Sequence, residues 1–313
     1  MSPPKLAYVG IAVNDAPGVA DIMTDFLGLA RRDAALGDGT RVPLLSVGET
    51  ALALFETGHP FLGGYEKPGV HHIAVAADAP RDFARAFALP PDAACPDTGI
   101  DGVDQCGIEP AATCGVRTRI CPPLSLAKGN GGNIQRIDHL GVASADNAAA
   151  TAVFNGQLGC PVESSQTDME VRMAVESFTS DKYGVVYHSR PPEPVGGLRV
   201  TFLTVGDCEL ELLQPFDPMP ESAAGNSDPA HDRPGNTRGD RGAIGRYIER
   251  RGPGLHHVAL KTPHINRLLP ELAGRGLRMI DTKGRPGSRR ALIGFIHPAA
   301  LGGLLLHFVE RDE

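Results

Sequence analysis

Three apolar segments of this chain carry histidine at nearly the same place, and imidazole is both a common metal ligand and a competent proton acceptor near pH 7. The segments are VHHIAVAA from Val70, IDHLGVAS from Ile137 and LHHVALKT from Leu255, and a further histidine, His307, follows the apolar run GGLLL. A single histidine in a strand is more often a half-buried structural residue than a ligand. The chemistry therefore depends on whether the fold brings several of these side chains together.

Glu211 is the acidic residue with the most informative surroundings. It lies in VGDCELELLQP, residues 205–215, which reads as part of a strand. Because neighbouring strand residues point to opposite faces, Glu211 is expected on the face opposite Leu210 and Leu212. There it could enter a site together with the histidines. The alternative is a surface carboxylate beside Glu209.

The elements that must position these side chains recur four times. The segment LAYVGIAV from Leu6 has the same apolar pattern as the three segments above, and each of the four begins one copy. In each copy a short apolar strand and a polar break precede a helix with one apolar stripe, and further strands follow. The clearest stripes have the helical spacing i, i+3, i+4 and i+7. They are Val19, Ile22, Met23 and Phe26 in the first copy, and Ile265, Leu268, Leu269 and Leu272 in the fourth. The sequence thus predicts an α+β fold of four βαβββ units.

The Gly/Asn-rich segment LAKGNGGN divides the four units into two pairs, since this composition is typical of a flexible linker. We expect a first domain over 1–128 and a second over 134–313. Two irregular stretches interrupt the second domain. The one at about 165–194 suggests an extra hairpin, and the one at about 217–243 is polar throughout. Inserted loops can cover a site or be neutral surface, and both alternatives stay open here.

Composition narrows the class of partner. The chain has 313 residues, 42% hydrophobic and 21% charged, with a net charge of −7, which argues against nucleic acid or an anionic membrane. No apolar run approaches the roughly 20 residues that span a bilayer. The start, MSPPKLAYVG, lacks the pattern of a signal peptide. We therefore expect a cytoplasmic protein.

Units of this kind, with histidine in the opening strand, resemble the vicinal-oxygen-chelate superfamily of glyoxalases, bleomycin-resistance proteins and extradiol dioxygenases. The second half resembles methylmalonyl-CoA epimerase in particular. This resemblance implies that paired units form a curved sheet in each domain, and that inward-facing residues of the second domain hold one divalent metal ion. The motifs that carry it are IDHLGVA (137–143), VGDCELELLQP (205–215), IERRGPGLHHVAL (248–260), GLRMID (276–281), RPG (285–287), FIHP (295–298) and GGLLLHFVE (302–310).

The resemblance implies four metal ligands, His139, Glu211, His257 and His307. The epimerase pattern has at position 307 a glutamate that binds the metal and takes part in proton transfer, so His307 departs from it. Three imidazoles and one carboxylate suit zinc, iron(II), cobalt or nickel better than magnesium or calcium. Glu211 and His307 are then the candidate catalytic residues, although His307 cannot easily bind the metal and accept a proton at once.

The first half provides an internal control for this ligand set. One histidine cannot hold a metal alone, so we expect a degenerate copy with a structural role. Alignment of the two halves places Tyr8 opposite His139, Ala53 opposite Glu211, His72 opposite His257 and, less closely, Arg119 opposite His307.

Two further arginines lie close to these motifs. Arg289 and Arg290, in GSRRALI, could meet a carboxylate or a phosphate near the site. We expect them instead to be solvated residues of a hairpin.

Three functions stay open. The first is an isomerase or epimerase that acts on an acyl-CoA or another 2-substituted carbonyl compound, with a metal that stabilises the enolate left after loss of an alpha proton. The second is an iron(II)-dependent dioxygenase of the ring-cleaving type, which likewise uses four units and one active half. The third is a non-catalytic protein that binds a small molecule. Four units in one chain allow either a monomer or a homodimer.

Overall fold

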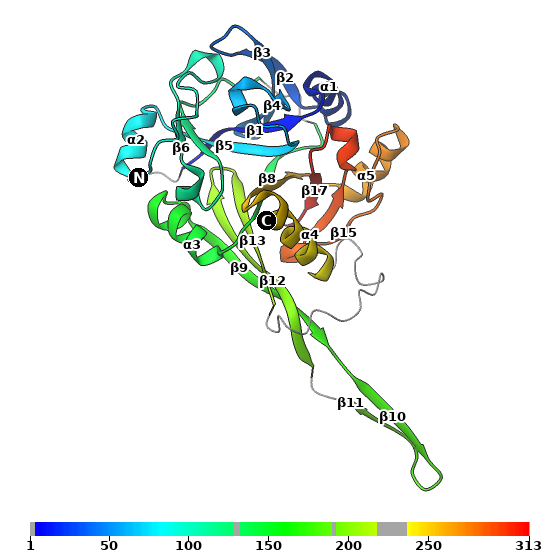
Figure 1. Cartoon of the computed structure of the whole chain (residues 1–313). Coiled ribbons are helices and arrows are strands. Elements are labelled where there is room, and N and C mark those ends of the chain that lie inside the picture. Colours follow the sequence, from blue (N-terminus) through cyan, green and yellow to red (C-terminus); the bar gives the residue numbers. More distant parts are fainter. Residues whose placement is uncertain (1–3, 128–131, 190–191, 218–236, 313) are drawn as a thin grey trace.

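Two sheets, one from each half of the chain, form the body of the protein (Figure 1). The computed structural model describes residues 4–127, 132–189, 192–217 and 237–312. The first sheet has seven strands in the order β2-β3-β4-β1-β5-β7-β6. These strands are β1 (Leu6–Val13), β2 (Ala30–Ala35), β3 (Arg41–Val47), β4 (Thr50–Glu56), β5 (Gly69–Ala76), β6 (Cys106–Ile108) and β7 (Thr118–Cys121).

The second sheet has eight strands in the order β15-β16-β17-β14-β8-β13-β12-β9. Its strands are β8 (Arg136–Ala143), β9 (Val162–Arg172), β12 (Glu193–Val205), β13 (Cys208–Phe216), β14 (Gly254–Lys261), β15 (Arg285–Pro286), β16 (Leu292–Phe295) and β17 (Leu306–Glu310). A separate two-stranded hairpin consists of β10 (Val175–Ser180) and β11 (Gly184–Ser189).

Each half repeats one arrangement twice. The opening strands of its two units pair antiparallel at the centre of the sheet, β1 with β5 and β8 with β14. Each opening strand also pairs in parallel with the last strand of its own unit. The predicted α+β fold of four repeated units is confirmed, although the second unit has only two strands, β6 and β7, after its helix.

Helices accompany each unit. The α-helices are α1 (Ala16–Leu27), α2 (Pro80–Ala86), α3 (Asn147–Thr151), which continues as a π-helix over Ala152–Gln157, α4 (Thr237–Arg251) and α5 (Ile265–Gly274). Short 3-10 helices span Pro60–Leu62, Ile100–Gly102, Pro110–Thr113, Ser288–Arg290 and Pro298–Leu301.

Helix α1 illustrates how the local sequence sets these elements. Its first free N–H groups are capped by Asp15, which accepts a hydrogen bond from the Gly18 amide at 2.9 Å. It ends at Gly28, whose left-handed φ of 73° suits glycine. Of the predicted apolar stripe, Val19 and Met23 are fully buried, because this face packs against the sheet. The helix is therefore held by its caps and by one buried face.

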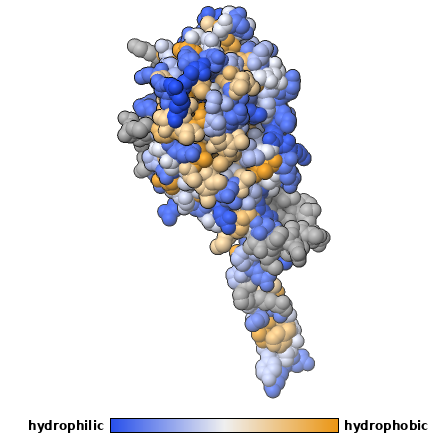
Figure 2. All heavy atoms as spheres, turned by 60° about the vertical axis from the view of Figure 1, so that its left-hand side comes forward, coloured by the Kyte–Doolittle hydropathy of each residue, from blue (hydrophilic) through white to orange (hydrophobic). Residues whose placement is uncertain are grey.

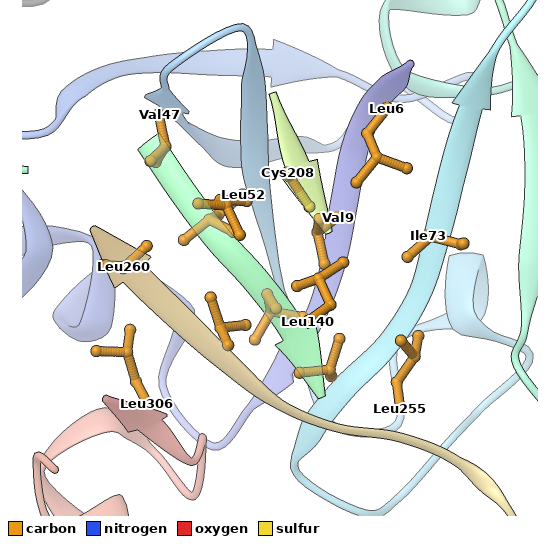
Figure 3. Close-up of a cluster of buried hydrophobic side chains, with 14 of the residues drawn as sticks. Leu6, Val9, Val47, Leu52, Ile73, Leu140, Cys208, Leu255, Leu260 and Leu306 are labelled. Atoms are coloured by element: carbon orange, nitrogen blue, oxygen red, sulfur yellow. The ribbon is translucent and has the colours of Figure 1, made fainter. Parts of the chain in front are cut away.

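The main core lies between the two sheets (Figure 3). Leu6 and Val9 of β1 belong to the same buried cluster as Leu140 of β8 and Leu255 and Leu260 of β14. Each sheet packs against the other through its apolar face. The opposite face of each sheet is therefore available for a site. The core also draws residues from both halves of the chain.

A long arm extends from the second sheet (Figures 1 and 2). It is formed by the outer parts of β9 and β12 and by the hairpin of β10 and β11, so the hairpin predicted at about 165–194 is confirmed. Most of the exposed large apolar side chains among the described residues lie on this arm: Met169, Val171, Met173, Val175, Phe178, Tyr183, Val185 and Tyr187.

The polar stretch predicted at about 217–243 extends less far than expected. Its part at 218–236 lies outside the described residues, but the chain is helical from the start of α4 at Thr237. The prediction was wrong for the last residues because Ile244, Tyr247 and Ile248, further along, give the helix one face that packs on the second sheet. No described helix is long and apolar enough to cross a membrane. The domain limits 1–128 and 134–313 stay a prediction.

Candidate metal centre

The four predicted ligands lie on four adjacent strands, on the face of the second sheet that is turned away from the first. Strand register places Gly141 of β8 between Glu211 of β13 and His257 of β14. It likewise places Ala259 of β14 between His139 and His307. Gly141 and Ala259 thus leave room on the central strands for the larger side chains of the neighbouring ligand residues.

Gly141 is required by this arrangement. A Cβ atom at residue 141 would lie 2.0 Å from Cε1 of the His257 ring, so even alanine would displace the imidazole. The glycine in the motif IDHLGVA therefore makes room for a ligand rather than for a turn. It lies inside a strand, where glycine often marks the close approach of another group.

The four side chains are close enough to share one ion. The candidate ligand atoms of His139, His257 and His307 all lie within 4.8 Å of one another. Glu211 Oε2 lies 3.4 Å from His139 Nε2 and 3.5 Å from His257 Nε2. All four residues are buried, with exposed fractions between 3% and 6%. No other cluster of three such side chains was found in the described part of the chain.

Two buried nitrogens in this cluster have no hydrogen-bond partner, namely His257 Nε2 and His307 Nδ1. Burial and the neighbouring His257 and His139 hold the pKa of His307 well below its usual value, so its imidazole is neutral. Burial favours the protonated form of Glu211, but the adjacent His139 and His257 outweigh it and lower the pKa of the carboxyl. Burial also lowers the pKa of His257, whereas at His139 the effect of burial is outweighed by Glu211 and Asp138, which raise the pKa. Neutral imidazole nitrogens of His257 and His307 beside an ionised carboxylate fit a divalent metal ion, whose binding requires the proton of His139 to leave.

Asp138 holds the first of these histidines and was missed by the sequence analysis. Ala259 pairs with His139 while Leu260 pairs with Ile137, so residue 138 is the extra residue of a β-bulge. Asp138 Oδ2 lies 3.0 Å from His139 Nδ1, which leaves Nε2 to face the cluster. A carboxylate on the far nitrogen of a histidine is the usual support of a metal ligand. The signal was the Asp-His pair in IDHLGVA.

Arginines keep Asp138 ionised although it is completely buried. Arg311 and Arg136 lie 3.2 Å and 3.6 Å from its Oδ1. Burial would raise the pKa of Asp138, but His139 and these two arginines hold it well below the ordinary value. Charge compensation of this kind is what permits a buried carboxylate. The Asp138 carboxylate can therefore orient His139 at any pH near neutrality.

A second pair supports His257. His256 is the extra residue of another bulge, and its Nδ1 lies 3.0 Å from His257 Nδ1. The His256 ring contacts Tyr247 of α4 edge-on, with 4.9 Å between centroids. Burial, together with His257, lowers the pKa of His256 to about 3, so it is neutral. This histidine turns toward α4, and His257 is the one that joins the cluster.

A cavity of about 280 Å³ lies above the cluster. Helix α4 packs over β12 and β13 beside it, through Ile244 and its neighbours. The wall includes the cluster itself, apolar side chains such as Phe202, Ile280 and Phe295, and several arginines. A mostly apolar cavity with a few polar groups is typical of a small-molecule site.

Arg289 does not lie in solvent as expected. Its guanidinium stacks on the Phe202 ring at 3.5 Å and forms an ion pair with Glu209 at 2.6 Å. Only 13% of the side chain is exposed. Arg290 is the exposed member of the pair.

The first half has the same strand registers without the same side chains. Gly10 pairs with Ala53 and His72, as Gly141 pairs with Glu211 and His257, and Ala74 pairs with Arg119, as Ala259 pairs with His307. The register therefore confirms the alignment of Tyr8, Ala53, His72 and Arg119 with His139, Glu211, His257 and His307.

The family comparison concerns the second half of the chain, which contains the four candidate ligands. Residues 138–295 match the family model of the glyoxalase/bleomycin resistance protein/dioxygenase superfamily. The chain is 22% identical over 189 residues to human mitochondrial methylmalonyl-CoA epimerase, which covers 60% of this chain and 81% of that protein. It is 24% identical over 136 residues to the mitochondrial methylmalonyl-CoA epimerase of Dictyostelium discoideum, covering 42% and 69% of the two chains.

The likeness to a solved structure extends over the whole chain. A triple mutant of 4-hydroxymandelate synthase from Streptomyces coelicolor superposes with a TM-score of 0.63 and covers 100% of this chain and 94% of its own. The sequences are 16% identical, so this likeness concerns the fold.

Proposed function

This chain belongs to the glyoxalase/bleomycin resistance protein/dioxygenase superfamily, and we propose that its second half is a metal-dependent isomerase or epimerase site for a 2-substituted carbonyl compound. One observation carries the proposal. Three buried histidines and Glu211 converge on one point at the base of a cavity, and two of the histidine nitrogens have no other partner.

His139, Glu211, His257 and His307 would hold the ion. Three imidazoles and one carboxylate favour zinc, iron(II), cobalt or nickel. When bound, such an ion supplies positive charge that polarises a substrate oxygen and makes an adjacent carbon more acidic. The apolar wall around Phe202 and Phe295 excludes water, which strengthens every charge interaction inside the cavity.

Proton transfer is assigned to Glu211 and His307. The lowered pKa of Glu211 keeps its carboxylate ionised, and the lowered pKa of His307 keeps its ring neutral, so each has a lone pair for a proton or for the ion. A side chain that is bound to the ion cannot accept the proton at the same time. Glu211→Gln, which preserves a ligand oxygen, and His307→Asn separate these roles: the base is the residue whose variant keeps the metal but loses exchange of the alpha proton.

Arg285 supports a substrate with an anionic group. It lines the cavity, and only 18% of its side chain is exposed. Its Nε lies 3.3 Å from Asp281 Oδ2, while its Nη1 is buried without a hydrogen-bond partner. A buried guanidinium N–H without a partner is costly unless a ligand fills its place. We therefore assign Arg285 to a carboxylate or thioester-linked anion of the substrate.

Epimerase homologues and the whole-chain fold suggest different chemistries, and one experiment separates them. The relatives above are named methylmalonyl-CoA epimerases, whereas the 4-hydroxymandelate synthase structure above matches over the whole chain. The second candidate is therefore an iron(II)-dependent dioxygenase, for which the nitrogen-rich ligand set is also suitable.

The test uses metal-loaded protein with methylmalonyl-CoA and related 2-substituted carbonyl compounds in D₂O. An isomerase incorporates solvent deuterium at the alpha carbon and consumes no oxygen. Oxygen uptake with iron(II) on a keto-acid or catechol substrate, without alpha exchange, would replace the first proposal by the second. A protein that takes up no metal after reconstitution would exclude both.

A further inference from the structure

The first half contains its own cavity, on the face of its sheet that corresponds to the metal centre. This cavity has a volume of about 430 Å³ and is lined by residues of β5, β6, β7 and the segment after β4. Its wall includes His71, His72, Arg117 and Arg119, with Cys95 on one side. A degenerate copy with only a structural role would be expected to fill this space with apolar side chains.

A guanidinium takes the place of the ligand set here. Strand register aligns Arg119 with His307 and Ala53 with Glu211, so the first half gains a fixed positive charge and loses the central carboxylate. His72 keeps its place, and its Nε2 lies 3.1 Å from the Tyr8 hydroxyl. The charge that a metal ion would bring to the second half is thus built into the first half as a side chain.

Arg119 is nearly completely buried, with 6% of the residue exposed. Its Nη2 donates a hydrogen bond to the Phe61 carbonyl oxygen at 2.6 Å, and its guanidinium lies 4.3 Å from the centre of the Phe61 ring. Its Nη1 is buried and has no hydrogen-bond partner. A buried cation is costly unless it is paired, so the free N–H groups at the cavity wall favour an anion.

The polar groups nearest to Arg119 are neutral. Burial, aided by Arg117 and Arg119, lowers the pKa of His71 to about 3, and burial together with Arg119 holds the pKa of His72 well below its usual value. Burial also raises the pKa of Tyr8, so the phenol keeps its proton. These groups can donate or accept hydrogen bonds, but they leave the positive charge uncompensated.

Carboxylates line the cavity without pairing with its arginines. Glu66 is exposed and Asp92 is half-buried, and both belong to the wall. Among the described residues, neither forms an ion pair with Arg119 or Arg117. Asp92 instead accepts a hydrogen bond from the amide of residue 94 at 2.9 Å. Arg117 is exposed and lies over the Tyr65 ring at 4.7 Å, where it can guide an anion inward.

We propose that the first half binds a small molecule with an oxyanion group, a carboxylate or a phosphate, through Arg119 in this cavity. The guanidinium fork matches such a group geometrically and stays charged at every physiological pH. This site is separate from the metal centre, and its positive charge comes from side chains of the first half.

The experiment measures the thermal midpoint and the heat of binding of the full chain with sodium phosphate and with sodium succinate, each against sodium chloride at equal ionic strength. We expect phosphate or succinate to raise the midpoint and to bind once per chain in Arg285→Met, which lacks the anion-binding residue proposed for the second half. The stronger of the two anions identifies the source of the oxyanion. Arg119→Met should weaken this binding at least tenfold. Arg117→Glu, at an exposed residue where folding is not at risk, should weaken it several-fold and reduce its dependence on salt.

His257→Ala is the matched control, because it removes a proposed metal ligand and leaves the first half unchanged. Anion binding that persists in His257→Ala and is lost in the Arg117 and Arg119 variants supports the proposal. The proposal is overturned if neither anion binds more tightly than chloride, if His257→Ala abolishes the binding, or if Arg117→Glu binds as tightly as the wild type. Because Arg117→Glu and His257→Ala decide the outcome on their own, the proposal can be refuted even where Arg119→Met does not fold.

Discussion

The two halves of this protein have the same frame and differ in the side chains placed on it. A His-His-Tyr cluster is present in both: Nδ1 of His71 and His72 are 2.9 Å apart, and those of His256 and His257 are 3.0 Å apart. In each half the first histidine meets a tyrosine ring edge-on at 4.9 Å. The backbone geometry that can hold a metal is therefore retained in the half that lacks the ligands.

The difference lies in a few positions. Where the second half has His139, Glu211 and His307, the first half has a phenol, a methyl group and a guanidinium. Asp138, the support of His139, corresponds to Ala7, which is the extra residue of the equivalent bulge in β1. Both halves thus share one strand register. Only the second half has metal-ligating side chains at the corresponding positions, so the register does not depend on those side chains.

The largest difference between the halves is expected from one substitution made twice, Gly141→Ala and Gly10→Ala. A Cβ at either residue would lie 2.0 Å from a histidine ring on the neighbouring strand, His257 or His72. Overpacking of this kind costs about 1–3 kcal/mol in the free energy of unfolding. Metal analysis should show that only Gly141→Ala loses its ion. Equal metal loss in both variants would mean that the first half takes part in the site.

Asp138→Asn tests the support of the first ligand. The amide oxygen can accept the hydrogen bond from His139 Nδ1–H only without the negative charge of the carboxylate, so metal affinity should fall about 10- to 100-fold. Competition with a chelator measures this change. Glu163→Gln is the control, since Glu163 contacts Arg289 at 2.8 Å but not the histidines. An unchanged affinity in Asp138→Asn would remove Asp138 from the account of the site.

Arg285→Met tests whether the cavity of the second half receives an anionic substrate. Loss of a charged hydrogen bond should raise KM roughly tenfold, with a smaller change in kcat. Arg290→Met is the control, because Arg290 is exposed and does not line the cavity. Steady-state kinetics on the substrate found by deuterium exchange provide the measurement, and a selective fall of kcat would assign Arg285 to another role.

The smallest effect concerns pH. Burial lowers the pKa of His71 to about 3, far below the value of about 6.5 in an unfolded chain. The folded state then binds fewer protons, so stability is complete above about pH 6.5 and falls as pH decreases, by at most about 1.4 kcal/mol per pH unit. Urea unfolding with a chelator present, at pH 7 and 5.5, should show a weaker pH dependence in His71→Gln than in the wild type. Equal pH dependence would show that His71 can be protonated in the folded protein.

Much of the fold could be predicted because its signals are local. The helical spacing of Ile265, Leu268, Leu269 and Leu272 predicts a buried stripe, and all four are buried in α5. This holds although Pro270 lies inside the helix, since the helix is only ten residues long. Helix α4 was missed because its sequence is rich in glycine and arginine, and its few apolar residues act only through their contact with the second sheet.

The candidate site was predictable only where successive side chains of a strand alternate regularly between the two faces of the sheet. His139, Glu211, His257 and His307 all lie on regular strand faces, and the structure brings them together. Asp138 breaks the alternation because a bulge turns it to the same side as His139. Arg285 and Arg119 each have a guanidinium nitrogen without a hydrogen-bond partner, which depends on the groups that the fold brings near it. Neither property can be read from spacing along the chain.

The most direct test of the central claim is the metal content of four purified proteins after reconstitution: wild type, His139→Ala, His257→Ala and His72→Ala. A single centre in the second half predicts one ion per chain in the wild type and in His72→Ala, and none in the other two. Full metal content in both His139→Ala and His257→Ala, or loss of the ion in His72→Ala, would contradict it.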